Sequence, residues 1–179
     1  VGVDAYKFLA REHVLLNSLT EIIKGARTEE LPERISDLLN KIKDIEKELA
    51  AVRSAQAMGQ IGALADSAQV LNGTTTITAV LPDGITGDDL RKIALELKAR
   101  APQSAVALIS ANEGKPVLVV AVSDAAKATG LKAGALVKIG STILGGGGGG
   151  KDDFAQGGGT DASKSQAALV AIADSISGK

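Results

Sequence analysis

Apolar residues in the first part of the chain recur three or four positions apart with charged residues between them, the spacing of an amphipathic helix. Residues 4–71 are therefore predicted to be helical. A first helix contains the apolar run from Phe8 to Ile23 and ends at Gly25. Residues 27–31 predict a turn, and a second helix is expected to continue to about Ala68. Two antiparallel helices joined by a short turn form a helical hairpin.

The second helix has the clearer pattern, an apolar heptad seam with alternating spacings of 4 and 3 residues. The seam consists of Leu31, Ile35, Leu38, Ile42, Ile45, Leu49 and Val52. Either the first helix covers this seam, or a second chain covers part of it in a homodimer. Glu12 stands where the first helix would need an apolar residue, so the first helix would cover the seam imperfectly. Both alternatives stay open at this point.

From residue 72 onward the pattern changes to short apolar or alternating runs separated by turn residues, which are typical of strands. Strands are predicted at 74–80, 105–109 and 116–122, and helices at 86–100, 124–130, 133–143 and 161–176. The third strand is apolar on both faces, which is typical of a central strand. We therefore expect an α+β protein. It has an antiparallel helical hairpin, or coiled coil, over residues 1–71 and a small α/β domain with a mixed sheet over residues 72–179.

Composition limits the kinds of chemical site that the chain can form. The 179 residues include no cysteine and one histidine, His13, so disulfides, thiolate metal sites and paired-histidine sites are excluded. No apolar run approaches the roughly 20 residues of a membrane span. With no signal peptide visible, a cytoplasmic protein without membrane contact is expected. The chain begins with Val1 rather than Met, so we expect a piece of a longer protein.

Charge is distributed unevenly along the chain, although the formal net charge is only −1. Residues 115–151 contain five lysines and one acid, Asp124, a local balance of +4. These lysines are Lys115, Lys127, Lys132, Lys138 and Lys151. The sequence therefore predicts a basic segment within a nearly neutral chain.

The most unusual stretch is GGGGGGKDDFAQGGG, residues 145–159. Glycine tracts are often flexible linkers, but only about 30 residues follow, too few for another domain. The tract is therefore predicted to lie inside the domain, where glycine permits close approach of another backbone or of a phosphate. A Walker A loop is rejected because Asp152 stands where that motif needs Ser or Thr.

Two features together carry a family resemblance: this glycine block following the segment KAGALVK, and the upstream helical segments around Tyr6–Leu16 and Glu30–Ile35. They resemble the C-terminal segment of alanyl-tRNA synthetases, with its coiled coil and DHH-associated domain. In that family an N-terminal catalytic part uses ATP and magnesium to charge tRNA with alanine. A middle domain with zinc hydrolyses mischarged tRNA, and the C-terminal piece binds the outer corner of the tRNA and often dimerises.

The resemblance implies a noncatalytic module that contacts alanine tRNA, pairs with a second copy and binds no cofactor of its own. Its implied RNA-binding residues are Lys127, Lys132, Lys138, Lys151 and Gln156. The glycine block consists of Gly145, Gly146, Gly147, Gly148, Gly149, Gly150, Gly157, Gly158 and Gly159. Many family members carry a cation inside this block, whereas here the first is Lys151, which favours a structural role for the glycines.

Two other interpretations remain. The DHH-associated domain also forms the substrate-binding half of DHH phosphoesterases, but those usually have His after the glycine block, where this chain has Lys151. A purely structural dimerisation module without RNA contact is consistent with the near-zero net charge.

Overall fold

The computed structural model describes residues 2–23, 27–59 and 61–178. The predicted end of the first helix at Gly25 lies outside these residues. The chain divides into two compact units, residues 1–48 and 49–179, which are considered separately.

The N-terminal part is helical, as predicted. Helix α1 spans Gly2–Ile22, a short 3-10 turn η1 spans Thr28–Glu30, and α2 spans Leu31–Gly59. The second helix ends before the predicted Ala68. The chain continues in a separate short helix, α3 (Ile61–Asp66), whose first residue is buried in the core of the globular unit. The heptad pattern did not reveal this separate short helix.

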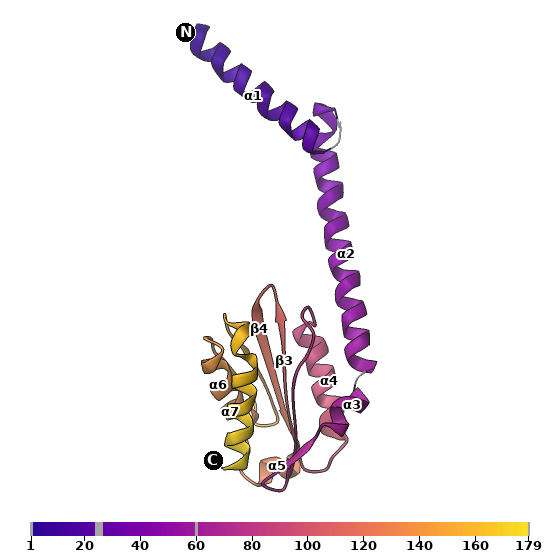
Figure 1. The fold of residues 1–179 in the computed structure, drawn as a ribbon, viewed down its shortest axis with the longest axis vertical. Helices are drawn as coiled ribbons and strands as arrows, with labels where there is room; N and C mark the ends of the chain where they lie inside the picture. Colours follow the sequence, from indigo (N-terminus) through magenta and orange to yellow (C-terminus); the bar gives the residue numbers. More distant parts are fainter. Residues whose placement is uncertain (1, 24–26, 60, 179) are drawn as a thin grey trace. The chain divides into compact units, whose positions relative to one another are not determined.

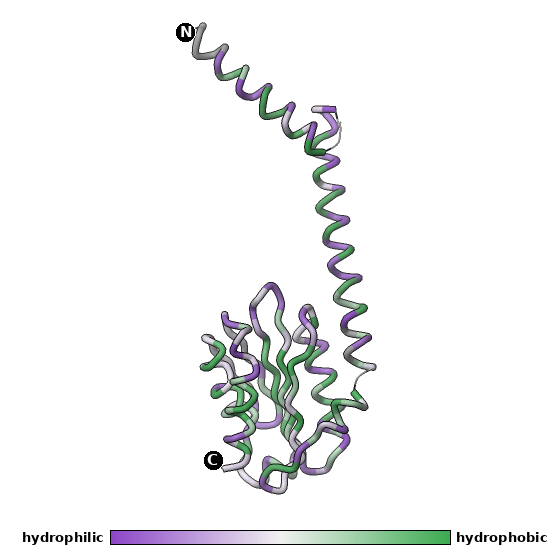
Figure 2. Tube along the Cα trace, in the orientation of Figure 1, coloured by the Kyte–Doolittle hydropathy of each residue, from purple (hydrophilic) through white to green (hydrophobic). Residues whose placement is uncertain are grey.

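Apolar and polar residues alternate along α2, as the bands of green and purple in Figure 2 show. Leu31, the first residue of the predicted seam, is buried. The rest of the seam is exposed, from 38% at Ile35 to 64% at Val52. The large apolar residues of α1 between Phe8 and Ile22 are exposed as well, including Phe8 at 61%. The first helix therefore leaves most of the seam uncovered.

The globular unit is built on a six-stranded mixed sheet with the strand order β1-β2-β3-β4-β6-β5. The strands span Gln69–Leu71, Thr74–Val80, Ser104–Asn112, Lys115–Val122, Gly148–Gly150 and Phe154–Gly158 for β1 to β6. Only the β2–β3 pair is parallel, and helix α4 (Gly87–Ala99) connects these two strands. The strand β4 lies between β3 and β6 with residues 118–122 fully buried, which confirms its prediction as a central strand.

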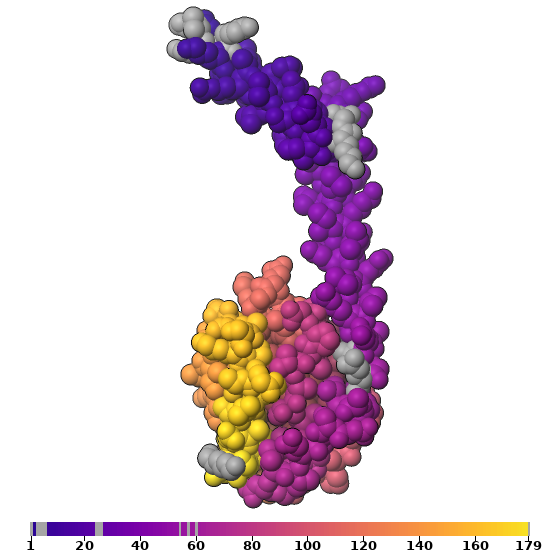
Figure 3. Space-filling model, in the orientation of Figure 1, coloured from indigo at the N-terminus to yellow at the C-terminus, as the bar shows by residue number. Residues whose placement is uncertain are grey.

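Helices cover both faces of the sheet (Figure 1). On one face α3 and α4 pack over a cluster that includes Leu90, Ile93, Leu108 and Val119. The other face is covered by α5 (Asp124–Ala128), α6 (Ala133–Ile143) and α7 (Ser165–Ser177). Helix α7 follows a short 3-10 turn, η2 (Ala162–Lys164), and forms the yellow band at the surface in Figure 3. Neighbouring β4 residues such as Leu118 and Val119 contribute to opposite clusters because successive strand side chains alternate between faces.

Three strands were not predicted. Strand β1 falls within residues 1–71, which were all expected to be helical, so the sheet begins before the expected boundary at residue 72. Strands β5 and β6 fall within the glycine block. Glycine is depleted in strands and provides no apolar alternation, so the block contained no strand signal to detect.

Two tight turns join the antiparallel neighbours of the sheet. Asn72-Gly73 connects β1 to β2, and Glu113-Gly114 connects β3 to β4. All four residues have positive φ, including 47° at Asn72 and 51° at Glu113. Two central residues with positive φ define the type I′ turn, whose twist matches that of the flanking strands. Asn-Gly is the preferred sequence for this turn, and Glu113 is a poor substitute.

The substitution Glu113→Asn is therefore expected to raise the free energy of unfolding by about 0.5 kcal/mol, because Asn tolerates the left-handed conformation better than Glu. Chemical denaturation of the two proteins measures the difference. The control Glu113→Val should lower stability, since a β-branched residue resists positive φ. Equal stability of the Asn and Val variants would contradict this reasoning.

Candidate nucleic-acid interface

The glycine block folds as the end of helix α6 followed by a hairpin of β5 and β6. Gly145 has a φ of +75°, and its N–H donates to the carbonyl of Thr142 at 3.2 Å. The N–H of Gly146 donates to the carbonyl of Ser141 at 2.9 Å. This pair of bonds is the Schellman motif, in which glycine in the left-handed conformation terminates a helix. The first glycine of the block is thus a helix stop.

The hairpin packs directly against α6 because it has no side chains to separate the two backbones. Gly148 lies opposite Gly157 in the β5–β6 ladder. A Cβ atom on Gly148 would stand 2.5 Å from the Cα of Gly157 and 2.6 Å from the Cγ1 of Val137 on α6. A Cβ atom on Gly157 would collide with the Oγ of Ser141. These two glycines therefore permit the close approach of helix and hairpin.

Four more glycines of the block are enclosed in the same way by neighbouring backbone: Gly146, Gly150, Gly158 and Gly159. In contrast, Cβ atoms on Gly147 and Gly149 would meet nothing within 4 Å. Most glycines of the block therefore lie where a side chain would collide with neighbouring atoms. The two remaining positions leave bare backbone at the surface.

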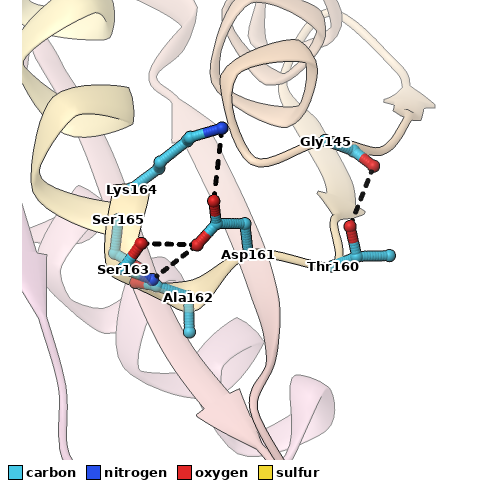
Figure 4. A network of polar contacts seen from close by, with 7 residues as sticks. All are labelled: Gly145, Thr160, Asp161, Ala162, Ser163, Lys164 and Ser165. Carbon is cyan, nitrogen blue, oxygen red and sulfur yellow. Dashed lines mark hydrogen bonds and ion pairs between the residues drawn. The ribbon is translucent and has the colours of Figure 1, made fainter.

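Polar contacts join Thr160 to the end of α6 and stabilise the turn η2 that precedes α7 (Figure 4). The Thr160 hydroxyl donates to the carbonyl of Gly145 at 3.5 Å. The carboxylate of Asp161 accepts from the backbone N–H and hydroxyl of Ser163 and pairs with Lys164 at 3.2 Å. The Ser163 hydrogen bond, followed by Lys164, lowers the pKa of Asp161. Asp161 thus caps the 3-10 turn η2, which leads into α7.

The lysines predicted to bind RNA do not form one uniformly basic surface. Lys132, just before α6, lies 3.4 Å from the carboxylate of Asp152 in the β5–β6 turn. Lys127, on α5, pairs with Asp124 at 2.7 Å. This hydrogen bond raises the pKa of Lys127 and lowers that of Asp124. The positive balance of residues 115–151 is therefore partly offset in space, and Asp152 lies just beyond that window.

Lys138 and Lys151 differ from these two lysines. Both are exposed, and neither forms an ion pair with any acid in the part of the chain that the structure describes. Lys151 lies in the turn of the glycine hairpin, where its backbone N–H donates to the carbonyl of Phe154 at 2.9 Å. Lys138 lies on α6, next to the Val137 that packs on the hairpin. They are the predicted cations best able to contact an anion.

The hairpin has a second surface, on the α4 side of the sheet, that sequence reasoning did not find. Gln156 is exposed on β6, and its side-chain amide nitrogen lies close to Gly87 at the start of α4. The Arg91 guanidinium lies over the ring of Phe154, 4.6 Å from its centroid, a cation–π contact. Gly149, the cross-strand partner of Gln156, has no side chain to cover it. No sequence pattern linked Arg91 to Phe154, because 63 positions of chain separate them.

Comparison with known proteins identifies a matching domain family and similar proteins. The DHHA1 domain model matches residues 73–178. The chain belongs to the DHHA1 domain family. It is 45% identical over 175 residues to an alanine–tRNA ligase of Streptomyces avermitilis, covering 96% of this chain, and 44% identical to one of Nocardioides. The chain spans about a fifth of the length of these relatives, 20% and 19% respectively.

A solved structure extends the comparison to the fold. The C-Ala domain from Aquifex aeolicus alanyl-tRNA synthetase superposes with a TM-score of 0.58 at 26% identity, covering 62% of this chain and 98% of that chain. The predicted resemblance to the C-terminal segment of alanyl-tRNA synthetases is therefore confirmed. The predicted mixed sheet with preceding helices is confirmed as well.

The close packing of the hairpin on α6 predicts that glycines of the same block differ in how well they tolerate substitution by alanine. Gly157→Ala should lower the free energy of unfolding by about 2–3 kcal/mol, because its methyl group overpacks against Ser141 and Gly148. Gly149→Ala is the matched control and should change stability by less than about 0.5 kcal/mol, since that position is open. Denaturant unfolding of the purified variants measures both. Equal effects would mean that α6 does not contact the hairpin as described.

Ser141 provides an independent check on the same contact. Its hydroxyl is fully buried and finds no hydrogen-bond partner among the described residues. Ser141→Ala should therefore raise stability, by about 1 kcal/mol, because it removes an unsatisfied polar group and favours the helix. A loss of stability in the same unfolding assay would show that the hydroxyl is satisfied in solution.

Proposed function

We propose that the chain is the C-terminal tRNA-binding and dimerisation module of an alanyl-tRNA synthetase. The observation that carries the proposal is the 45% identity to an alanine–tRNA ligase across nearly the whole chain. In this role the module holds the outer corner of alanine tRNA. The upstream catalytic and editing domains of the same polypeptide act on the distant acceptor end and supply the ATP, magnesium and zinc chemistry.

The surface chemistry supports recognition of folded RNA by shape. Aromatic residues make up only 2% of the chain, too few to stack many unpaired bases. The bare backbone of Gly147 and Gly149 and the exposed amide of Gln156 instead provide a side on which an RNA backbone can approach closely. Lys151 and Lys138 supply phosphate contacts near the hairpin. A few such contacts give weak, salt-sensitive binding, on the order of micromolar at physiological salt.

The module as proposed has no catalytic residue and acts in the cytoplasm. No helix in the described ranges is long and apolar enough to cross a membrane. Within those ranges no group of three or more His, Cys, Asp or Glu side chains is placed to hold a metal ion.

Binding to folded alanine tRNA tests the proposal. Fluorescence anisotropy should show tighter binding to the full tRNA than to a minihelix of its acceptor arm, and binding should weaken steeply as salt increases. Equal and feeble binding to both RNAs would contradict tRNA recognition and leave dimerisation as the sole role.

Ion pairing predicts which lysines matter most. Lys151→Ala and Lys138→Ala should each weaken tRNA binding about two- to fivefold and reduce the slope of log K against log salt by about one. Lys127→Ala is the matched control and should have a smaller effect, because its ammonium group is already paired with Asp124. A larger loss from the control would place the RNA contact at α5 instead of the hairpin.

A further inference from the structure

The outer edge of the sheet is bare on its α4 side. Successive residues of β6 alternate between the two faces, with Ala155 in the cluster under α6 and Phe154 packed against the cluster under α4. Gln156 therefore lies on the α4 side, and so does Gly149, its cross-strand partner on β5. A Cβ atom on Gly149 would meet nothing within 4 Å, so no other described part of the chain covers the strand at this point.

The chain itself gives no reason for glycine at position 149. The φ of Gly149 lies outside the positive region that favours glycine, in contrast to Gly145 at +75°. A side chain would also fit, because the position is open. Glycine in a strand costs conformational entropy that alanine would save. A bare residue at that cost indicates that something outside the described chain approaches the backbone closely here.

Arg91 on α4 borders this bare strand and is supported by an aromatic ring. Its guanidinium group lies 4.6 Å from the centroid of the Phe154 ring, and the residue is exposed. Arg91 forms no ion pair among the described residues, whereas its neighbour Lys92 pairs with Asp89 at 3.1 Å. A guanidinium group held over a ring keeps N–H donors available, and two of them match the oxygens of a phosphate.

A second cation flanks the same aromatic residue. The backbone N–H of Lys151 donates to the carbonyl of Phe154 at 2.9 Å, so these two residues lie across the hairpin turn from each other. Lys151 likewise has no ion-pair partner in the described ranges. The bare strand and the Gln156 amide are thus accompanied by two available positive charges from separate elements. An anionic sugar-phosphate backbone complements this combination, whereas an apolar peptide does not.

We propose that Arg91 is an RNA-binding residue, and that the sugar-phosphate backbone of the RNA passes over Gly149 on the α4 side of the hairpin. This inference rests on the proposed tRNA-binding function and specifies one of its contacts. Arg91 binds a phosphate, Gln156 supplies a donor and an acceptor beside it, and Gly149 leaves the space that a ribose needs. Phe154 is a positioning residue, because it acts through the guanidinium group that it supports.

Substitution of Arg91 tests the phosphate contact. In a fluorescence-anisotropy titration with folded alanine tRNA, Arg91→Ala should weaken binding about fivefold and reduce the slope of log K against log salt by about one. Arg91→Lys should recover only part of the affinity, because an ammonium group cannot make the two-pronged contact. Lys92→Ala is the matched control, with the same change of net charge on the same helix, and should weaken binding less than about twofold.

Phe154→Leu separates support of the guanidinium group from contact with RNA. Leucine keeps the apolar packing against the α4 cluster and removes the aromatic face. Binding should weaken about two- to threefold with an unchanged salt slope, since Arg91 still reaches the phosphate. The double variant with Arg91→Ala should bind no more weakly than Arg91→Ala alone, because no guanidinium group remains to be positioned. Additive losses would overturn the positioning role.

Added bulk at residue 149 tests where the RNA backbone lies. Gly149→Val should weaken tRNA binding about tenfold, because an uncharged branched side chain fills the space and offers a phosphate nothing in return. The denaturant midpoint of this variant should stay near that of the wild type, since the position is open. Ala135→Val is the matched control, at an exposed residue of α6 on the other side of the sheet, and should change binding less than about twofold.

The outcomes separate this inference from the function on which it rests. A wild-type chain that prefers full tRNA to the acceptor minihelix, together with unchanged binding by Arg91→Ala and Gly149→Val, would overturn the inference and leave the function intact. Equal and feeble wild-type binding to both RNAs would overturn the two together. A loss in Lys92→Ala as large as that in Arg91→Ala would show that only net charge matters, and would overturn the direct contact.

Discussion

Helix α6 and the β5–β6 hairpin pack with their backbones unusually close together. Gly148 and Gly157 lie where any side chain would strike Val137, Ser141 or the opposite strand. Because the hairpin sits this close to α6, β6 can pair with the central strand β4 while α6 covers the same end of the sheet. Two strands with almost no apolar side chains of their own are thereby held in the fold. Ordering so many glycines is entropically costly, and packing and ladder hydrogen bonds offset that cost.

The hairpin turn also supplies one of the two acids that pair with the predicted lysines. The turn of the hairpin brings Asp152 to Lys132, while Lys127 is occupied by Asp124. Lysines that are close together in the sequence thus acquire different partners in space. Of the lysines predicted to bind RNA, only Lys138 and Lys151 have no ion-pair partner among the described residues.

Much of the fold could be predicted from the sequence because its signals are local. The helix at residues 133–143 coincides with α6, the strand at 74–80 coincides with β2, and Thr86 and Asp161 cap helical segments. The glycine strands could not be predicted, since their pairing depends on what surrounds them and not on their own side chains. The separate helix α3, with Ile61 buried in the core of the globular unit, was likewise not evident from the local pattern. At the candidate site, the lysines were found from the local excess of positive charge and the family resemblance. The pairing of Lys127 with Asp124 is local, three residues apart on α5, whereas the Asp152 partner of Lys132 and the Arg91–Phe154 contact are tertiary features that one sequence does not reveal.

The six consecutive glycines of residues 145–150 have different surroundings in the structure. One ends a helix, three are enclosed by neighbouring backbone, and Gly147 and Gly149 face open space. Substitutions over evolutionary time should therefore collect at alternate positions of the tract. A homologue can gain a cation at 147 or 149 without any change in its backbone. The tract thus combines enclosed positions that hold the backbone with two open positions at which a side chain would change the charge of this surface.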